Sequence, residues 1–186
     1  MQTEVIVAGF GGQGVLLTGQ LLAYAGLLEG KNVAWVPSYG PEMRGGTANC
    51  SVIVSDQAIG SPLVEEPCAA LIFNQPSLEK FEPRIRPSGL LLVNSSIVNT
   101  GGVKRKDMHI YHVPASEIAG RLGNSRVANM VALGAYLDLT GVVSLDAVLA
   151  ALAKVLPVNK HSLLEVNRRA AELGAMAVRR PIAAEA

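Results

Sequence analysis

The hydrophobic pattern of the N-terminal part of the chain predicts a strand, a helix and a second strand. Residues 4–8 form a short apolar run, rich in β-branched side chains and closed by a glycine, which is typical of a buried parallel strand. Residues 15–29 carry apolar side chains at helical spacing, and Gly30 favours the end of that helix. A second strand is expected over 33–36, ended by Pro37. These elements predict a βαβ unit with a right-handed crossover.

The rest of the chain first alternates strands with helices and then becomes helical. We expect strands at 47–55, 69–73, 89–93 and 110–113, a short helix at 77–81, and later helices at 115–122, 127–139, 145–156 and 162–178. This order predicts an α/β fold, with a Rossmann-like, mostly parallel sheet, flanking helices and a helical C-terminal layer. Ser125, Arg126 and Asn129 lie at the start of one helix, and we expect them to cap it or to face a partner.

The composition indicates a neutral, apolar protein. Of the 186 residues 49% are hydrophobic and 17% are charged, the formal net charge is +1 and the mean hydropathy is +0.32. The balanced charge argues against a nucleic-acid-binding protein, because no basic excess exists to neutralise phosphates. We expect a single domain over 1–186, with a βαβ-rich core at 1–113, a helical layer at 114–180 and a tail at 181–186. We also expect this apolar chain to bury surface against a partner.

The sequence predicts a cytoplasmic protein without a metal site. The N-terminus has neither the basic segment nor the long apolar run of a signal peptide. The most apolar stretch, 127–143, contains Asn129 and Asp138 and is too interrupted to span a membrane, so we expect a buried helix there. The two cysteines, Cys50 and Cys68, cannot by themselves hold an iron–sulfur cluster or a structural zinc ion.

A glycine-rich segment joins the first strand to the helix and matches the pattern G-x-G-x-x-G; it reads Gly9-Phe10-Gly11-Gly12-Gln13-Gly14. Such glycines allow a sharp turn, close approach of a ligand, or close packing of helix on strand. The free N–H groups at a helix start also favour an anion such as phosphate. A dinucleotide site would need an acidic residue after the second strand, where Pro37-Ser38-Tyr39 stands instead. A structural turn and a phosphate site for another ligand therefore remain open beside the dinucleotide site.

A second unusual segment follows the second strand and reads Tyr39-Gly40-Pro41-Glu42-Met43-Arg44-Gly45-Gly46-Thr47. Loops at the carboxyl ends of strands form the ligand crevice of a doubly wound sheet, so we expect this loop beside the glycine turn. Arg44 is suited to bidentate contact with a carboxylate or phosphate, or it pairs with Glu42 or a neighbouring subunit. Our candidate ligand- or interface-binding residues are Gly9, Gly11, Gly12, Gln13, Gly14, Tyr39, Glu42, Arg44, Gly45 and Gly46. We expect no catalytic residue in this chain.

Together the two segments resemble the gamma subunit, or gamma domain, of the 2-oxoacid:ferredoxin oxidoreductases. The PEMRGG loop follows the GGQG turn at the family's spacing, and the segments 74–77, 113–119 and 123–130 also resemble the family's sequence. One departure precedes the strand at Ala70, where the family often has an aspartate and this sequence has Cys68 and Ala69.

The resemblance implies a subunit of an enzyme that converts a 2-oxoacid, coenzyme A and oxidised ferredoxin to acyl-coenzyme A, carbon dioxide and reduced ferredoxin. Pyruvate, 2-oxoglutarate and branched-chain oxoacids all remain open as substrates. Thiamine diphosphate, Mg and Fe–S clusters are expected on other chains of the complex, because this sequence has neither a Gly-Asp-Gly thiamine segment nor a cysteine cluster.

The implied partners are the alpha, beta and delta subunits, with ferredoxin reached through the complex. The isolated chain is expected to be inactive and to form a homodimer. In the complex it would contribute to assembly and dock the phosphates of coenzyme A at the glycine turn and the Arg44 loop. Two alternatives are the small subunit of an indolepyruvate:ferredoxin oxidoreductase and a free-standing, nucleotide-binding Rossmann-like module.

Overall fold

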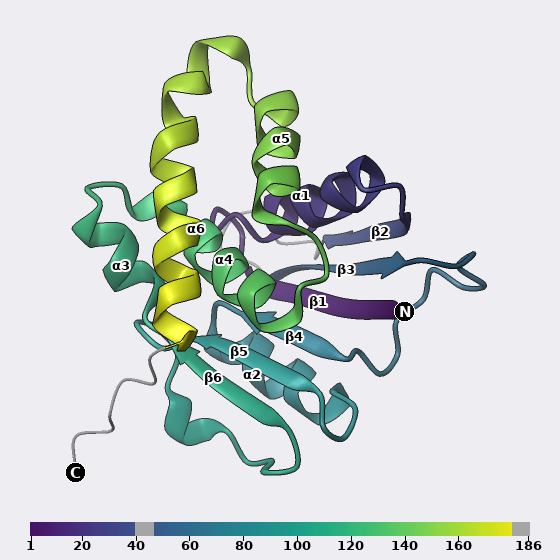
Figure 1. Ribbon diagram of the computed structural model, residues 1–186. Coiled ribbons are helices and arrows are strands. Elements are labelled where there is room, and N and C mark those ends of the chain that lie inside the picture. Colours follow the sequence, from purple (N-terminus) through teal and green to yellow (C-terminus); the bar gives the residue numbers. More distant parts are fainter. Residues whose placement is uncertain (40–46, 180–186) are drawn as a thin grey trace.

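The computed structural model describes residues 1–39 and 47–179, which form a sheet covered by helices on both faces (Figure 1). Within these residues the sheet has six strands in the order β2-β3-β1-β4-β5-β6. The strands are β1 (Gln2–Phe10), β2 (Asn32–Tyr39), β3 (Thr47–Ser55), β4 (Ala69–Ile72), β5 (Leu90–Asn94) and β6 (His109–Val113). β1, β4, β5 and β6 are parallel, whereas β3 runs antiparallel to both neighbours. The predicted α/β fold with a mostly parallel sheet is confirmed.

The helices end within two residues of the predicted positions. They are α1 (Val15–Leu28), α2 (Gln75–Phe81), α3 (Ala115–Arg121), α4 (Ala128–Thr140), α5 (Leu145–Val155) and α6 (Leu164–Arg179). Short 3-10 segments lie at Glu82–Arg84, Thr100–Gly102, Ser125–Val127 and Val158–Leu163. Among the described residues, no helix is both long and apolar enough to cross a membrane. The proposed division of the chain at 113 and 180 stays a prediction, and 181–186 lies outside the described residues.

One expectation about β2 is wrong. The strand does not end at Pro37 but continues to Tyr39, with Pro37 opposite Cys50. Because β2 is an edge strand, its outer side needs no ladder hydrogen bonds and tolerates a proline. β1, α1 and β2 do form a βαβ arrangement, because both strands run antiparallel to β3 and are therefore parallel to each other, but β3 lies between them in the sheet.

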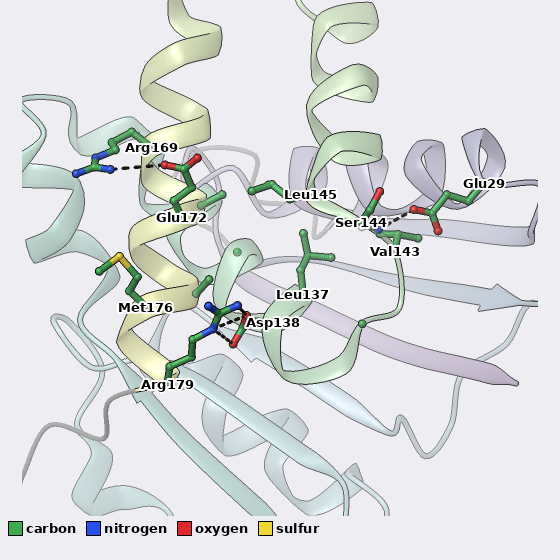
Figure 2. A pocket seen from close by; sticks show the side chains of 14 residues that line it. Glu29, Leu137, Asp138, Val143, Ser144, Leu145, Arg169, Glu172, Met176 and Arg179 are labelled. Carbon is green, nitrogen blue, oxygen red and sulfur yellow. Dashed lines mark hydrogen bonds and ion pairs between the residues drawn. The ribbon is translucent and has the colours of Figure 1, made fainter.

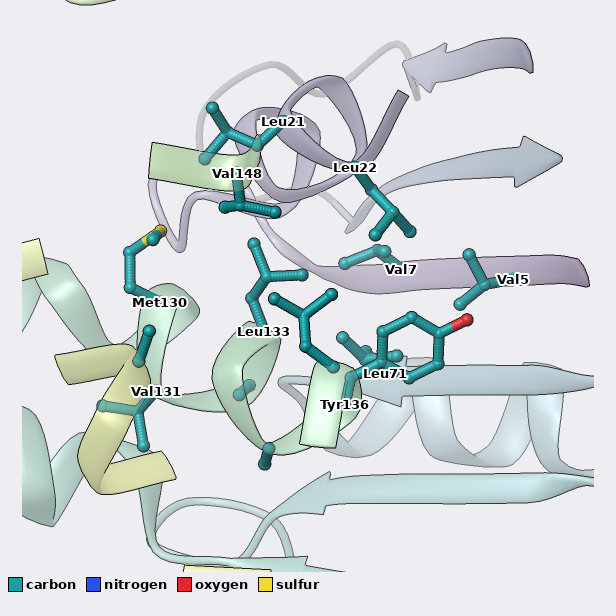
Figure 3. Packing of buried hydrophobic residues seen from close by; sticks show 14 of the residues in the cluster. Val5, Val7, Leu21, Leu22, Leu71, Met130, Val131, Leu133, Tyr136 and Val148 are labelled. Carbon is teal, nitrogen blue, oxygen red and sulfur yellow. The ribbon is translucent and has the colours of Figure 1, made fainter. Parts of the chain in front are cut away.

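The two faces of the sheet carry separate hydrophobic clusters. Side chains of β1 alternate between them: Val5 and Val7 pack under α1, α4 and α5, whereas Ile6 and Ala8 pack toward α2. The larger cluster surrounds α4, whose buried side chains include Leu133 and Tyr136 (Figure 3). The alternation of a strand that is buried on both faces thus builds a three-layered structure.

Helix α4 is enclosed between the sheet and α6, which confirms the buried helix expected within 127–143. Its residues from Asn129 to Leu137 are all buried. A Cβ atom added to Gly134 would overlap the backbone of Ala171 in α6, and one added to Gly174 would overlap the backbone of Val131 in α4. The two glycines therefore allow the helix backbones to approach each other closely.

Candidate functional site

The glycine turn lies at the edge of the sheet where five strands, β1, β2, β4, β5 and β6, end. β1 ends at Phe10, which pairs with Thr47, the first residue of β3. The last residue of β2, Tyr39, pairs with Ala48. The two ends of the segment 40–46 are therefore anchored one and two strands away from the glycine turn. In an α/β sheet this carboxyl edge is the usual ligand crevice.

Part of the candidate set cannot be placed. Glu42, Arg44, Gly45 and Gly46 lie outside the described residues, and only the backbone of Tyr39 is described. A contact between these residues and the glycine turn stays a prediction that rests on the positions of their anchors.

Gln13 holds the glycine turn in shape. Its side-chain Oε1 accepts a hydrogen bond from the backbone N–H of Phe10 at 2.6 Å. Its Nε2 donates to the carbonyl oxygen of Phe73, just after β4, at 3.0 Å. The amide thus joins the carboxyl ends of two neighbouring strands, β1 and β4. This bracing role is additional to the ligand contact that the sequence suggested.

The glycines of the turn serve different needs. Gly9 is required by packing, because an added Cβ would lie 2.8 Å from Cβ of Phe73. Gly12 and Gly14 have φ angles of +93° and +75°, in the left-handed region that disfavours other residues. Gly11 and Gly12 are exposed, and nothing lies within 4 Å of a Cβ added to Gly12. The backbone of the turn is therefore accessible to a ligand or a partner chain.

The first turn of α1 is suited to an anion. No described side chain caps it, and it contains no acidic residue. The Thr18 hydroxyl does not cap these N–H groups, since it donates to the carbonyl oxygen of Gly14 at 2.9 Å. The first N–H groups of a helix carry a partial positive charge and lack partners within the helix. The fold thus presents unneutralised donors beside the exposed glycines.

A buried asparagine connects α4 to this turn. The Nδ2 of Asn129 lies 3.5 Å from the carbonyl oxygen of Gly14 and 3.4 Å from the hydroxyl of Thr18. Asn129 is only 3% exposed, and its Cγ lies 2.7 Å from a Cβ added to Gly14. The expectation that Asn129 caps its own helix is wrong. The N-cap of α4 is Val127, which makes no side-chain cap, and Asn124 instead caps the preceding 3-10 segment Ser125–Val127 by accepting from the N–H of Arg126 at 3.1 Å.

The groove in Figure 2 lies toward the opposite end of α1, between α4, α6 and the start of α5, and has a volume of about 730 Å³. None of the candidate residues that the structure describes lines it. Its charged side chains already have partners: Asp138 binds Arg179 through both carboxylate oxygens, and Arg169 lies 3.6 Å from Glu172. The carboxylate of Glu29 accepts from the N–H of Ser144 at 2.7 Å. The groove therefore has no free charge with which to recognise an ionic ligand.

The pKa of Glu29 reflects these contacts. Burial acts to raise the pKa of its carboxyl, but the hydrogen bonds from Ser144 and the charge of Lys31 outweigh burial and hold the pKa below its ordinary value. Glu29 thus joins the end of α1 to the start of α5 as a carboxylate.

Both thiols belong to the packing of the sheet. Cys50 is fully buried beneath α1, and burial raises the pKa of its thiol to about 11. Cys68 donates to the carbonyl oxygen of Glu4 at 2.9 Å and accepts from the N–H of Glu4 at 3.1 Å. It belongs to the stretch, Cys68 and Ala69, in which the family described above often has an aspartate. The described residues contain no group of three or more His, Cys, Asp or Glu side chains that could hold a metal ion.

Comparison with known proteins covers nearly the whole chain. A family model described as pyruvate ferredoxin/flavodoxin oxidoreductase matches residues 4–177. The 2-oxoglutarate synthase subunit KorC of Methanocaldococcus jannaschii is 35% identical over 159 residues, which are 84% of this chain and 85% of KorC. The ketoisovalerate oxidoreductase subunit VorA of Methanothermobacter thermautotrophicus is 40% identical over 185 residues, 99% of this chain but 38% of VorA.

Among solved structures, the gamma subunit of a keto/oxoacid ferredoxin oxidoreductase from Geobacter sulfurreducens is similar to this chain with a TM-score of 0.81 and 31% sequence identity. The match covers 96% of this chain and 99% of that subunit. By contrast, the chain spans only 30% and 38% of the length of the two VorA relatives from Methanothermobacter.

Proposed function

The chain belongs to the pyruvate ferredoxin/flavodoxin oxidoreductase family, and we propose that it acts as the gamma subunit of a multisubunit 2-oxoacid:ferredoxin oxidoreductase in the cytoplasm. The observation that carries this proposal is the match to a gamma subunit of known structure, which extends over 96% of this chain in sequence and fold. The complex would convert a 2-oxoacid and coenzyme A to acyl-coenzyme A and carbon dioxide and pass two electrons to ferredoxin.

We assign the cofactors of the proposed complex to its alpha, beta and delta chains. Thiamine diphosphate with Mg supplies, when bound, the electron sink that decarboxylation of a 2-oxoacid needs, and Fe–S clusters carry the electrons. This chain has two cysteines in its whole sequence, and both thiols are engaged within the fold: Cys50 donates to the carbonyl oxygen of Val15 in α1 and Cys68 to that of Glu4 in β1. Its own part is to assemble with the other chains and to dock coenzyme A.

The docking surface would be the carboxyl edge of the sheet around the glycine turn. The uncapped first turn of α1 and the exposed backbone at Gly11 and Gly12 can donate hydrogen bonds to a phosphate group of coenzyme A. Arg44 belongs to the segment anchored next to this turn and would supply a cation. Gln13 and Asn129 would keep the turn in position from beneath.

The fold argues against a free-standing dinucleotide-binding module. In such modules the strand next to β1 ends in an acidic residue that binds the ribose. Here the neighbour of β1 on that side is the antiparallel β3, which begins at this edge with Thr47. The indolepyruvate alternative is not favoured either, since the relatives reported above are named for ketoisovalerate and 2-oxoglutarate.

A reconstitution experiment tests the assembly part of the proposal. The companion chains are purified with and without this chain, and reduction of ferredoxin is followed with pyruvate, 2-oxoglutarate or ketoisovalerate. We expect reduction that needs coenzyme A, one of the oxoacids and this chain. Full activity of the companion chains alone would contradict the proposal.

A single substitution tests the docking part. Replacing Arg44 by Ala should raise the apparent Michaelis constant for coenzyme A by about tenfold, which corresponds to about 1.4 kcal/mol of lost binding. The Michaelis constant for the oxoacid should stay within about twofold, because the lost interaction concerns only the phosphate. Arg86→Ala, a change of the same kind outside the candidate set, is the control. An unchanged constant for coenzyme A in a fully assembled complex would contradict docking at Arg44.

A further inference from the structure

A small pocket lies beside the first turn of α1, between the start of α4 and the connection from α5 to α6. Its volume is about 320 Å³, and its apolar residues are Leu17, Val127, Leu152, Leu156 and Leu163. Leu17 is the third residue of α1, so the pocket adjoins the uncapped helix start next to the glycine turn. Small-molecule sites measure roughly 300–1,000 Å³, so this pocket can hold one ring system but not a whole coenzyme.

The side chain of Asn129, which also lines the pocket, has an oxygen without a partner. Its Nδ2 faces the carbonyl oxygen of Gly14 at 3.5 Å and the hydroxyl oxygen of Thr18 at 3.4 Å. A carbonyl oxygen can only accept, so the NH₂ group must be the part of the amide that faces Gly14. Among residues 1–39 and 47–179 no donor then reaches Oδ1 of Asn129.

This oxygen keeps access to the pocket. The described side-chain atoms that are fully buried and lack a partner do not include Oδ1 of Asn129. Because the residue as a whole is only 3% exposed and lines this pocket, the pocket is the route by which a ligand reaches its oxygen. A nearly buried acceptor without a partner favours a ligand that carries a hydrogen-bond donor.

Arg126 adds a positive charge to the same pocket. Its side chain is exposed, and within the described part of the chain it has no carboxylate partner, whereas Arg121, Arg168 and Arg169 each form an ion pair. A guanidinium group without a carboxylate is suited to a phosphate. The pocket thus combines apolar walls, an acceptor and a cation, which fits a ligand with an apolar ring, an amino group and a phosphate.

We propose that this pocket binds the adenine ring of coenzyme A, beside the glycine turn that binds its phosphates. This inference rests on the proposed function. The ring packs against Leu17 and Leu156, and its amino group donates to Oδ1 of Asn129. Arg126 faces the phosphate on the adjoining ribose.

The chemistry of the proposed reaction decides which end of coenzyme A stays in this subunit. The thiol must reach the oxoacid at the thiamine site, which we assign to another chain, so the pantetheine arm leaves the subunit. The adenine ring lies at the opposite end of the molecule and takes no part in acyl transfer. Binding of such a remote group serves to orient the reacting end. A pocket for one ring system in this chain is therefore assigned to adenine rather than to the arm.

The test fills the pocket and measures the two halves of coenzyme A separately. Adenosine bisphosphate and S-methyl phosphopantetheine, which has no free thiol, serve as competitive inhibitors against coenzyme A in the reconstituted reduction of ferredoxin. Leu156→Trp, at a half-buried position directly after α5, should raise the inhibition constant of adenosine bisphosphate about tenfold and leave that of the phosphopantetheine within about twofold. The matched control is Leu63→Trp, at a 72% exposed leucine between β3 and β4, which should leave both constants within about twofold of wild type.

A second variant covers the case in which Leu156→Trp does not fold. Arg126 is exposed, so Arg126→Ala should retain the fold. We expect it to raise the inhibition constant of adenosine bisphosphate about fivefold, because a charged contact with phosphate is lost. Arg86→Ala, at an exposed arginine that does not line the pocket, is the control.

The outcomes separate this inference from the proposed function. Unchanged inhibition by adenosine bisphosphate in both folded variants, with ferredoxin reduction intact, would overturn the adenine pocket and leave the proposed function standing. Weaker inhibition by the phosphopantetheine alone would assign the pocket to the other end of coenzyme A and also overturn the inference. Ferredoxin reduction by the wild-type complex without coenzyme A would contradict the proposed function itself.

Discussion

Helices α1 and α6 lie on the same side of the sheet, α1 directly on the sheet and α6 over α4, but their outer surfaces differ in charge (Figure 1). The outward side of α6 carries charged side chains that form ion pairs with their neighbours, including Arg168 with Asp146 at 3.6 Å and Arg179 with Asp138. α1 has no charged side chain at all. A protein that needed only to fold could have used the pattern of α6 for both helices.

The inner sides of the two helices are alike. The difference in charge between their outer sides therefore reflects what surrounds the protein rather than its core. Each helix uses glycine to approach its neighbour closely: Gly174 of α6 lies on α4, and Gly19 of α1 lies on Cys50 and Trp35 of the sheet. The demands of the core therefore do not distinguish the helices. What distinguishes them is the expected environment of their outer sides, which is water for α6 and a protein surface for α1.

The largest effect is expected at the inner side of α6. Gly174→Ala would place a Cβ against the carbonyl oxygen of Val131, which belongs to the backbone of α4 and cannot move without displacing that helix. We expect the free energy of unfolding to fall by about 2–3 kcal/mol, since overpacking outweighs the better helix propensity of alanine. Urea denaturation of the isolated chain measures this. The control is Met176→Ala, at a 49% exposed position two residues further along α6, with an expected change of about 0.5 kcal/mol or less. A Gly174→Ala protein of wild-type stability would show that α4 and α6 can separate freely.

A smaller effect is expected at the inner side of α1. A Cβ added to Gly19 would meet the sulfur of Cys50 and lie 2.9 Å from Nε1 of Trp35, both of them side-chain atoms. Side chains can rotate where a backbone cannot, so we expect Gly19→Ala to lower the free energy of unfolding by about 1 kcal/mol. The fluorescence of Trp35, the only tryptophan of the chain, reports the shift directly. A loss as large as that of Gly174→Ala would show that the two inner sides are equally rigid.

The separation along the chain between contacting residues explains how much of the fold the sequence could predict. Apolar runs gave the strands β1, β4, β5 and β6 and therefore the parallel part of the sheet. The antiparallel insertion of β3 was missed, because an alternating strand such as Thr47–Ser55 shows that one face is buried but not which strand is its neighbour.

The candidate site also combines a local sequence feature, which could be predicted, with contacts between residues distant along the chain, which could not. The G-x-G-x-x-G pattern is local, so the turn between β1 and α1 followed from the sequence, whereas its exposure at Gly11 and Gly12 was found only in the structure. The supporting contacts of Gln13 and Asn129 were missed, because their partners lie 60 and 115 positions away along the chain. The sequence marked Asn129 as a helix cap or a partner contact, and the resemblance marked its segment, but neither indicated a contact with the glycine turn.

The smallest effect is expected where α1 does carry a polar contact, at the residue that follows its last turn. Glu29 joins α1 to α5 through the N–H of Ser144 at 2.7 Å, and its pKa is held below the ordinary value against the opposing effect of burial. A carboxyl with a lowered pKa stabilises the folded state above its unfolded pKa of about 4.3, and this stability is lost as the pH falls through the folded pKa. Glu29→Gln should therefore lower the free energy of unfolding by about 0.5–1 kcal/mol at pH 7 and by progressively less toward pH 3. Urea denaturation at both pH values measures the difference, with Glu172→Gln on α6 as the control, because its partner Arg169 is 3.6 Å away and the two side chains are 39% and 58% exposed. An equal loss at both pH values would show that the contact between Glu29 and Ser144 depends on the shape of the side chain rather than on its charge.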